Sequence, residues 1–440
     1  MVQYPPPGKH ESFENNVEFA QKLDKEDPLK HFRDKFYIPV VNGKESIYFT
    51  GNSLGLQPKS TQEYILNELE AWANYGVEGH FHARTPWVNY HEIFPPLLSD
   101  IVGALPEEII VMNQLTVNLH LLMISFYRPT KKRYKIICEA KAFPSDQYAM
   151  ASQARLHRLD PLDVIIEIKP DLATQIIDNN VILNSIKQHG DSLALVMFGG
   201  VNYYNGQVFN MESITNAAHE AGALCGFDLA HAAGNVPLQM HDWDVDFACW
   251  CSYKYLNSGP GGVAGAFINK KHFNDPELMR LTGWWGHNKS SRFKMEKDFQ
   301  AIPTAEGWQL SNSPVLSMAA HKSSLDIFAE AGIMKLFKKG KLLNDYLLFL
   351  ISEINTNRNE NVIQIITPNN ENEKGCQVSM LMKSNGKNIF EALKKHGVLA
   401  DWREPNVIRI APVPLYNTFE EVYLFSEMLG KLLSNPAAAK

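Results

Sequence analysis

The stretch Asp246-Phe-Ala-Cys-Trp-Cys-Ser-Tyr-Lys254-Tyr-Leu-Asn-Ser-Gly-Pro-Gly-Gly262 decides the fold and marks a site. Its apolar part predicts a buried strand that carries Lys254 at the C-terminal end, where a glycine-rich turn follows. Open α/β sheets hold ligands at the carboxyl ends of their strands. A lysine shielded from water there can act as a nucleophile or a base. Taken alone, Lys254 is more simply explained as a surface lysine at a strand end.

A second strand end lies upstream, in Gly222-Ala-Leu-Cys-Gly-Phe-Asp228-Leu-Ala-His231-Ala-Ala-Gly234. A buried carboxylate at Asp228 needs a partner, because an unpaired interior charge is costly. A protonated pyridine nitrogen is such a partner, and it makes a cofactor ring an electron sink. The simpler alternatives are a helix cap at Asp228 and a structural core role for His231. Asp228 and Lys254 on successive strand ends together favour a cofactor site.

Two further segments fit the same site. Thr116 stands where a helix is predicted to start, and the free N–H groups of a helix N-terminus bind phosphate. An ordinary threonine cap is the alternative. Phe143-Pro144-Ser145-Asp146 follows a predicted strand and offers an aromatic ring for stacking and a second carboxylate. By itself this tetrapeptide is a weak signal.

The surrounding sequence alternates strands with helices. Apolar runs of strand length are 134–138, 164–168, 193–198, 224–228, 247–252 and 264–268. Runs that are apolar throughout predict a mainly parallel sheet covered by helices on both faces. A helix is expected at 60–72, with a Ser60–Glu63 capping box. We therefore predict an α/β fold with an N-terminal lead-in (1–45), a large domain (46–310), a connecting segment (311–334) and a smaller α+β C-terminal domain (335–440).

Composition narrows the class of protein. The 440 residues have a formal net charge of -6, so no basic field exists to hold nucleic acid. The apolar runs 119–127 and 193–198 are shorter than the roughly 20 residues of a membrane helix, and the N-terminus does not read as a signal peptide. Five scattered cysteines fit reduced thiols, and Cys249 and Cys251 lack two further metal ligands. We expect a cytoplasmic protein that binds no nucleic acid, membrane or metal.

Taken together, these residues resemble the kynureninase family, within the class V aminotransferase-like branch of fold-type I (aspartate aminotransferase-like) pyridoxal-phosphate enzymes. The resemblance runs over nearly the whole chain. Its least specific part is the Asp228–Lys254 pair, which many fold-type I enzymes share. Its most specific parts are Gly283-Trp-Trp-Gly-His287 and Ala411-Pro-Val-Pro-Leu-Tyr-Asn417. The other segments that carry it are 48–56, 115–122, 143–146, 206–207, 227–234, 252–255, 292–295 and 311–314.

The resemblance implies a set of roles around pyridoxal 5'-phosphate. Lys254 would hold the cofactor as a Schiff base and move the Cα proton, and Asp228 would pair with the pyridine nitrogen. Phe143 would stack on the ring. The remaining cofactor contacts would be Leu115, Thr116, Pro144, Ser145, Asp146, His231, Tyr253 and, from a second subunit, Trp284 and Asn312.

The resemblance also implies the reaction and the partner. A homodimer with shared active sites would hydrolyse the Cβ–Cγ bond of L-kynurenine or 3-hydroxy-L-kynurenine, releasing an anthranilate and L-alanine. This belongs to tryptophan catabolism or NAD biosynthesis. Arg409 would hold the substrate carboxylate, with Asn52 and Ser53 at the same end. Tyr253 is the candidate for proton transfer at the γ-ketone. His80 and Asn312 match positions that animal-type members use around the aromatic ring, which favours the 3-hydroxy substrate.

Alternatives stay open at this point. A cysteine desulfurase or selenocysteine lyase would need a reactive, exposed cysteine, whereas Cys376 lies in an apolar run. An aminotransferase uses the same lysine and electron sink. A non-catalytic relative would be expected to have lost Lys254 or Asp228. Gly199 departs from the animal pattern, in which a hydroxyl residue reaches the phosphate.

Overall fold

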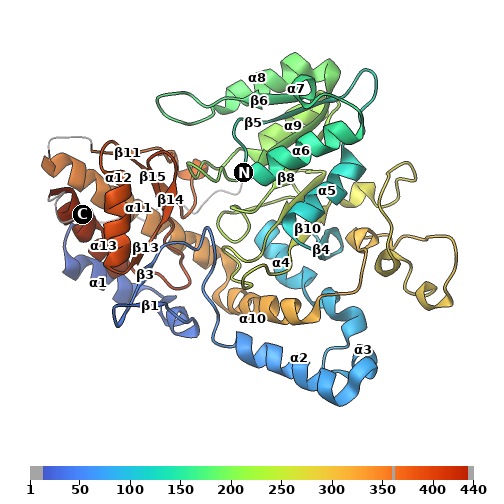
Figure 1. Cartoon of the computed structure of the whole chain (residues 1–440), viewed down its shortest axis with the longest axis horizontal. Coiled ribbons are helices and arrows are strands. Elements are labelled where there is room, and N and C mark those ends of the chain that lie inside the picture. The colour runs from blue at the N-terminus through green and yellow to red at the C-terminus, as the bar shows by residue number, and fades with distance from the viewer. Residues whose placement is uncertain (1–12, 359–361, 435–440) are drawn as a thin grey trace.

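The computed structural model describes residues 13–358 and 362–434, so the parts of the predicted terminal segments at 1–12 and 435–440 lie outside the described residues. Figure 1 shows two lobes. One contains the large sheet with its helices, and the other contains the C-terminal elements together with the first helix. The residues expected to form the site lie mostly where the strands of the large sheet end.

The large sheet has seven strands in the order β4-β10-β9-β8-β7-β5-β6. Strands β5 to β9 pair in parallel, while β10 runs antiparallel to both β9 and β4. This confirms the predicted α/β class and its mainly parallel sheet. The strands are β4 (Ile109–Val111), β5 (Lys135–Glu139), β6 (Ile165–Ile168), β7 (Leu193–Gly199), β8 (Leu224–Asp228), β9 (Phe247–Trp250) and β10 (Gly265–Ile268).

Alternate residues of each strand point to opposite sides of this sheet, and helices cover both faces. On β7, Val196 and Phe198 join one core cluster, and Leu195 and Met197 join another. Helices α4 (Pro95–Val102), α8 (Asn179–His189), α9 (Met211–Glu220) and α10 (Val315–Ala331) cover the first face. Helices α5 (Leu115–Phe126) and α6 (Pro144–Leu156) cover the second.

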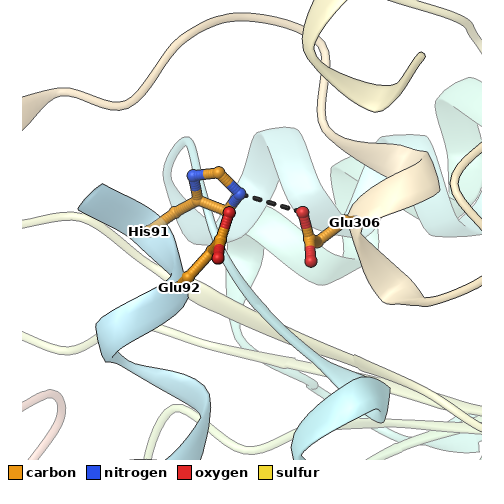
Figure 2. A group of neighbouring side chains, drawn as sticks. All are labelled: His91, Glu92 and Glu306. Atoms are coloured by element: carbon orange, nitrogen blue, oxygen red, sulfur yellow. Dashed lines mark hydrogen bonds and ion pairs between the residues drawn. The ribbon is translucent and has the colours of Figure 1, made fainter. Parts of the chain in front are cut away.

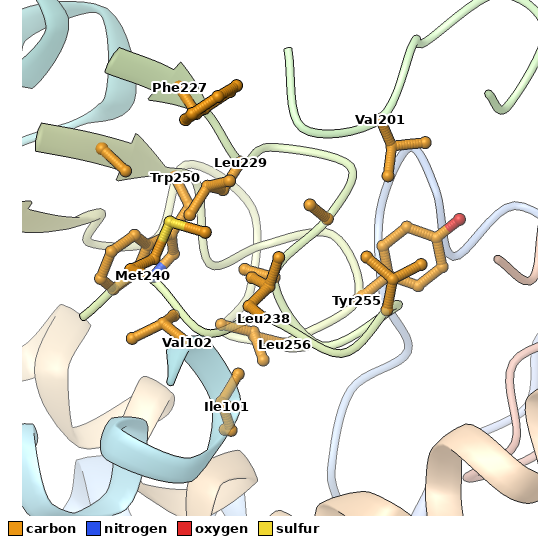
Figure 3. Packing of buried hydrophobic residues seen from close by; sticks show 14 of the residues in the cluster. Ile101, Val102, Val201, Phe227, Leu229, Leu238, Met240, Trp250, Tyr255 and Leu256 are labelled. Atoms are coloured by element: carbon orange, nitrogen blue, oxygen red, sulfur yellow. The ribbon is translucent and has the colours of Figure 1, made fainter. Parts of the chain in front are cut away.

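The first of these clusters continues beyond the strands into the loops that carry the site. Figure 3 shows Phe227 and Trp250 on the strands, above Ile101 and Val102 of α4. Leu229, which directly follows Asp228, and Leu256, which follows Lys254 by two residues, are both fully buried in the same cluster. The backbone on either side of the two site residues is therefore fixed by packing on rigid elements.

The smaller lobe is built on a four-stranded antiparallel sheet in the order β11-β12-β15-β14. Its strands are β11 (Ile363–Ile365), β12 (Val378–Met382), β14 (Asp401–Arg403) and β15 (Val407–Ile410), and its helices are α11 (Ile333–Arg358), α12 (Gly386–Lys395) and α13 (Phe419–Ser434). A parallel pair of short strands, β3 (Ile47–Tyr48) and β13 (Val398–Leu399), ties the lobe to the N-terminal part of the chain.

Helix α1 (Val17–Glu26) packs into this lobe, although it begins the described chain. Phe19 and Ala20 lie in the same core cluster as Leu429 of α13. The Asp24 carboxylate accepts the N–H groups of Phe419 (2.7 Å) and Glu420 (2.9 Å), and so caps α13. The predicted domain boundaries themselves stay predictions, but the N-terminal lead-in lies with the C-terminal elements in space.

One local prediction is wrong. Helix α2 (Thr61–Tyr75) forms as expected, but Ser60 makes no side-chain cap because its own backbone is already helical (φ −70°, ψ −17°). Near the end of this helix, the Trp72 side chain is 62% exposed. No helix of the described residues is both long and apolar enough to cross a bilayer.

Candidate active site

A small cavity opens at the carboxyl edge of the large sheet, where Lys254 and Asp228 meet. Lys254 is 9% exposed, and its Nζ lies 3.1 Å from Nε2 of His231. Burial and the nearby Lys254 charge hold the pKa of His231 well below its usual range. The imidazole is therefore neutral, its Nε2 accepts from the Lys254 ammonium, and Nδ1 carries the hydrogen.

Three carboxyl groups face one another beside this lysine: Asp228, Asp146 and Glu139. Burial raises the pKa of Asp228, although Lys254 and the Ala230 N–H at 2.7 Å oppose the rise. The pKa of Asp146 is raised further, by burial and then by the negative Asp228. Asp146 is therefore the protonated member of the pair and donates to the Asp228 carboxylate.

Glu139, which the sequence did not single out, completes this cluster. It ends β5, and the Gly199 N–H at the end of β7 donates to its Oε1 at 3.0 Å. Burial raises the pKa of Glu139 to about 7. Gly199 pairs in register with Asp228, so Gly199 lies at the carboxylate end of the cavity. In the sequence, Glu139 is marked only by its position at the end of an apolar run. Many residues without a functional role share that position.

The other end of the cavity suits an anion. Leu115 and Thr116 line it with the first N–H groups of α5, a helix of 12 residues. Ser145 and Tyr253 lie on the same wall, and Pro144 opens helix α6 beside them. The helix begins at Leu115, one residue before the predicted start.

Phe143 forms one side of the cavity. Its ring centroid lies 5.8 Å from Nζ of Lys254. The ring packs edge-on against that of Tyr203, with the two centroids 5.2 Å apart. Tyr203 was not predicted and also lines the cavity. It links the cavity to Arg409, whose guanidinium donates to the Tyr203 carbonyl.

These residues fit pyridoxal phosphate. Within the described residues, Oδ1 of Asp146 and Nδ1 of His231 are buried and lack a hydrogen-bond partner. Such atoms require a polar group beside them. Asp228 is available to a pyridinium nitrogen, the N-terminus of α5 to a phosphate, and the Lys254 amine to an aldehyde carbon.

The predicted carboxylate-binding residues form a second group next to this cavity. Arg409 is fully buried on β15 and donates to Asp401 as well as to Tyr203. Ser53 Oγ also donates to Asp401, at 2.6 Å. Burial would raise the pKa of Asp401, but Arg409, Ser53 and Arg403 together hold it below its usual value. Asp401 was not predicted.

Asn52 lies in the same region. It is buried, and its Nδ2 donates to Oε1 of Gln377 at 3.0 Å. Among the described residues, Oδ1 of Asn52 and Nε of Arg409 are buried without a partner, so both are available to a bound carboxylate or amine.

Three predicted site residues belong neither to the cavity of this chain nor to the group around Arg409. Trp284 is 46% exposed and donates its indole N–H to the Arg292 carbonyl at 2.9 Å. Asn312 is exposed, and His80 packs against Trp87. A single chain thus brings together the predicted residues of the cofactor and carboxylate sites, but not these three.

All five cysteines are buried and free. Burial raises the pKa of Cys376 to about 12, and that of Cys251, beside the cavity, is also raised. A thiol held protonated in this way is a poor nucleophile. The site therefore lacks the reactive, exposed cysteine that a desulfurase requires.

Comparison with solved structures gives the fold. An apo cysteine desulfurase from Thermococcus onnurineus NA1 superposes with a TM-score of 0.72 at 18% identity, over 94% of this chain and 98% of that one. The cystine C–S lyase C-DES, solved with glycine covalently linked to its PLP cofactor, gives 0.73 at 16% identity, over 87% and 96%. These structures therefore share the fold of this chain, in which Asp228 ends β8 and Lys254 follows the neighbouring strand β9.

Curated relatives are far more similar in sequence. A kynureninase of Flavobacterium psychrophilum is 55% identical over 419 residues, covering 95% of this chain and 98% of the relative. That of Mus musculus is 46% identical over 432 residues, covering 94% and 93%. Residues 336–429 match the family model "Kynureninase C-terminal domain". The chain belongs to the kynureninase family, and pyridoxal 5'-phosphate is its cofactor.

Proposed function

We propose that this protein hydrolyses the Cβ–Cγ bond of L-kynurenine, of its 3-hydroxy form, or of both, giving L-alanine and the corresponding anthranilate. The proposal rests on one observation above all: a kynureninase covering nearly the whole chain is 55% identical to it. Lys254 and Asp228 line the same cavity, which supports the proposal.

When bound, pyridoxal phosphate supplies an electron sink for negative charge that develops on the substrate. Asp228 holds the proton of the pyridine nitrogen, and the protonated Asp146 stabilises the Asp228 charge. Lys254 moves the proton at the substrate Cα. The neutral His231 beside Lys254 can accept a hydrogen bond without adding a second positive charge.

Arg409 binds the substrate α-carboxylate as a two-pronged donor, which suits guanidinium geometry. Its contact with Asp401 orients the guanidinium, while the unpartnered Nε remains available to the substrate. Asn52 offers its free Oδ1 to the substrate amine at the same end. Ser53 acts through Asp401 in this arrangement.

Tyr253 serves as a proton donor at the oxygen of the γ-ketone. Burial raises the pKa of its phenol above the usual value, so the hydroxyl keeps its proton at neutral pH. A protonated phenol can donate to an oxyanion but cannot accept the proton of the attacking water. A different group must therefore activate that water.

Assembly and specificity complete the proposal. His80 and Asn312 surround the substrate's aromatic ring, which favours 3-hydroxykynurenine, and Trp284 and Asn312 reach the cofactor site of a second subunit in a homodimer. The position of these three residues outside the cavity of a single chain supports this arrangement. Gly199 offers no side chain to the cofactor, and its N–H already donates to Glu139.

The visible absorbance spectrum of the purified protein, followed by separate addition of the two substrates, tests this function. We expect a yellow cofactor band and equal amounts of L-alanine and a fluorescent anthranilate. Lys254→Ala should lose both the band and the activity, whereas Lys339→Met, at another buried lysine, should keep the band. A yellow protein that forms neither product would contradict the proposed reaction and leave the cofactor assignment standing.

A further inference from the structure

A cluster of ionisable groups lies outside the cavity, where the short 3₁₀ helix η3 (Trp87–Ile93) meets the chain near Glu306. Figure 2 shows His91, Glu92 and Glu306 turned toward one another. Such a set resembles a metal site, but the Lys289 ammonium lies 3.0 Å from Glu92 and 2.8 Å from Glu306. The lysine therefore already supplies the positive charge that a metal ion would bring.

The histidine of this cluster has a different consequence. His91 is 1% exposed, and its Nε2 lies 3.0 Å from Oε2 of Glu306. Burial would raise the pKa of Glu306, but His91 and Lys289 hold it below its usual value, so Glu306 is a carboxylate that accepts from Nε2. On the other side of the ring, Nδ1 lies 3.4 Å from Oγ of Ser313. His91 thus ties η3 to both ends of the segment 306–313.

The first residue of η3 makes a second connection. The Trp87 ring packs edge-on against His80, with centroids 5.4 Å apart. It also covers Gly79 so closely that a Cβ there would lie 2.5 Å from the indole. The Trp87 N–H donates to Oε2 of Glu68 at 2.8 Å, which fixes the indole on α2.

Two residues that are distant in sequence therefore depend on one short helix. His80 is held through Trp87, and Asn312 is held through its neighbour Ser313 and His91. Under the proposed function these are the two residues that surround the substrate's aromatic ring. A hydrogen bond to a ring hydroxyl discriminates only while its partner is held in place.

We propose that η3 is the element that sets discrimination between hydroxylated and unsubstituted aryl substrates, with His91 and Trp87 as its positioning residues. His91 and Trp87 act through Asn312 and His80, and contact neither the cofactor nor the reacting atoms. The inference rests on the proposed function, because it assumes that His80 and Asn312 face the aryl group.

Steady-state kinetics of the cofactor-loaded enzyme with L-kynurenine and 3-hydroxy-L-kynurenine tests the inference. Ser313→Ala removes only the hydrogen bond between Ser313 and His91, whereas His91→Phe also removes the bond to Glu306. For each variant we expect the kcat/KM ratio of the hydroxylated to the plain substrate to fall about five- to tenfold, through KM, as expected for one lost hydrogen bond. The kcat on plain kynurenine should stay within about twofold.

A binding measurement separates this inference from the reaction itself. The affinity of 3-hydroxyanthranilate, followed by its own fluorescence, should weaken in Ser313→Ala, while that of anthranilate should not change. His91→Gln, which keeps one donor and one acceptor, should retain most of the discrimination. His241→Gln is the matched control, because His241 bonds a different carboxylate, the buried Glu108, at 2.9 Å.

The outcomes are distinct. If the wild-type enzyme cleaves neither substrate, the proposed function fails and the inference falls with it. If the wild type cleaves both, and folded Ser313→Ala and His91→Phe keep its ratio and its product affinities, the inference alone is overturned. A loss of the same size in His241→Gln would also overturn it, because the effect would then reflect stability.

Discussion

At the scale of single residues, the charges around Lys254 do not balance. Asp228, Asp146 and Glu139 are buried together, and burial raises the pKa of each of them. Carboxylates that share a low-dielectric space cannot all be ionised, so protons are kept within the group. The pKa of Glu139, about 7, falls within the physiological range.

A stability measurement on Glu139→Gln tests this conclusion. The folded-state pKa of Glu139 is about 7, above the usual 4.5, so its contribution to stability is full below pH 4.5 and is lost as the pH rises through 7. Glu139→Gln cannot ionise, so its stability does not fall over this pH range for that reason. In urea unfolding of the cofactor-free protein, we expect the variant to gain roughly 2.5 kcal/mol relative to the wild type between pH 5 and pH 8.

Glu167→Gln provides the control for this measurement, because Glu167 is exposed on the neighbouring strand β6. It should show no change with pH relative to the wild type. A relative stability of Glu139→Gln that is the same at pH 5 and pH 8 would contradict the raised pKa.

Arg409 gives a second test at this scale. In Arg409→Lys the fork of donors is lost while the positive charge is kept. We expect KM for kynurenine to rise about 10- to 100-fold, since one charge-assisted hydrogen bond is worth roughly 1.5–3 kcal/mol. Arg403→Lys is the control, because Arg403 also bonds Asp401 but is itself partly exposed. It should leave KM nearly unaltered. Equal effects of the two substitutions would argue against carboxylate binding by Arg409.

The sequence indicates the strand-end residues of the cavity more clearly than it indicates the residues that orient the side chains of the site. Asp228 and Lys254 stand out because Asp228 ends one apolar strand and Lys254 closely follows the next, just before a glycine-rich turn. Asp401 lies on a strand of the other lobe, and only folding brings it to Ser53. Nothing local marks such a contact, because a long-range partner is set by tertiary packing.

At the scale of elements, the edge of the sheet opposite the cavity is held by one carboxylate. Asp246 directly precedes β9 and accepts the N–H of Cys225 on β8 at 2.7 Å. His219 of α9, at 2.9 Å, and His272 of the 3₁₀ helix η6 (Lys270–His272), at 2.8 Å, also bond its two oxygens. Four elements therefore share one buried anion.

Asp246→Asn should weaken this junction. Burial would raise the pKa of Asp246, but His219, His272 and Lys271 outweigh burial and hold it well below its usual value of 3.8. The stabilisation is therefore present above pH 3.8 and is lost as the pH falls further. We expect the variant to lose about 3 kcal/mol at neutral pH, as for other broken buried pairs, with the difference narrowing below pH 4. Thermal unfolding from pH 3 to 7.5 measures both effects.

The neighbouring Asp244→Asn is the control, because Asp244 also bonds Lys271 but is more than half exposed. It should cost less than about 1 kcal/mol, as surface ion pairs do. A similar loss in both variants would mean that burial of Asp246 is not the source of the effect.

Most strands were predictable from sequence, and the small elements were not. The run 224–228 matches β8 residue for residue, and 193–198 matches β7 except for its last residue, because continuous apolar runs bounded by turns have few other solutions. Helix η3, by contrast, has only two fully buried side chains, Tyr90 and His91, within seven residues. The position of η3 is set by the elements packed around it, so its sequence has no periodic apolar pattern that would predict a helix.

At the scale of the whole molecule, the proposed dimer makes a sharp prediction. If Trp284 serves the site of the partner subunit, then Lys254→Ala and Trp284→Ala subunits, each with little activity, should complement each other when unfolded together and refolded. A mixed dimer would contain one intact site. Random pairing then gives about a quarter of the wild-type specific activity.

Mixing Lys254→Ala with Asp228→Asn is the control. Both residues line the cavity of the same chain, so no mixed dimer contains an intact site. Activity recovered only in the first mixture would support shared sites, and recovery in neither mixture would contradict them. Light scattering of the unmixed protein gives the mass of the assembly independently.

The division into two lobes was predictable, but the place of the N-terminal helix was not. Residues 335–440 read as a separate unit because their strands and helices follow a new pattern after α10. Helix α1 is short and mostly polar, and its buried Phe19 and Ala20 carry no sign of the surface that covers them. Only the folded chain places them beside α13.

That placement has a consequence for how a ribosome makes the protein. Helix α1 leaves the exit tunnel long before α13, because the backbone N–H groups that Asp24 caps belong to residues 419 and 420. At a synthesis rate of roughly 5–20 residues per second, its apolar residues wait on the order of 20–80 seconds for their partners. The large lobe can finish folding during that interval. Helix α1 is thus synthesised before the large lobe but packs after it, and we expect nascent chains to need chaperones that shield Phe19 and Ala20 until α13 has been made.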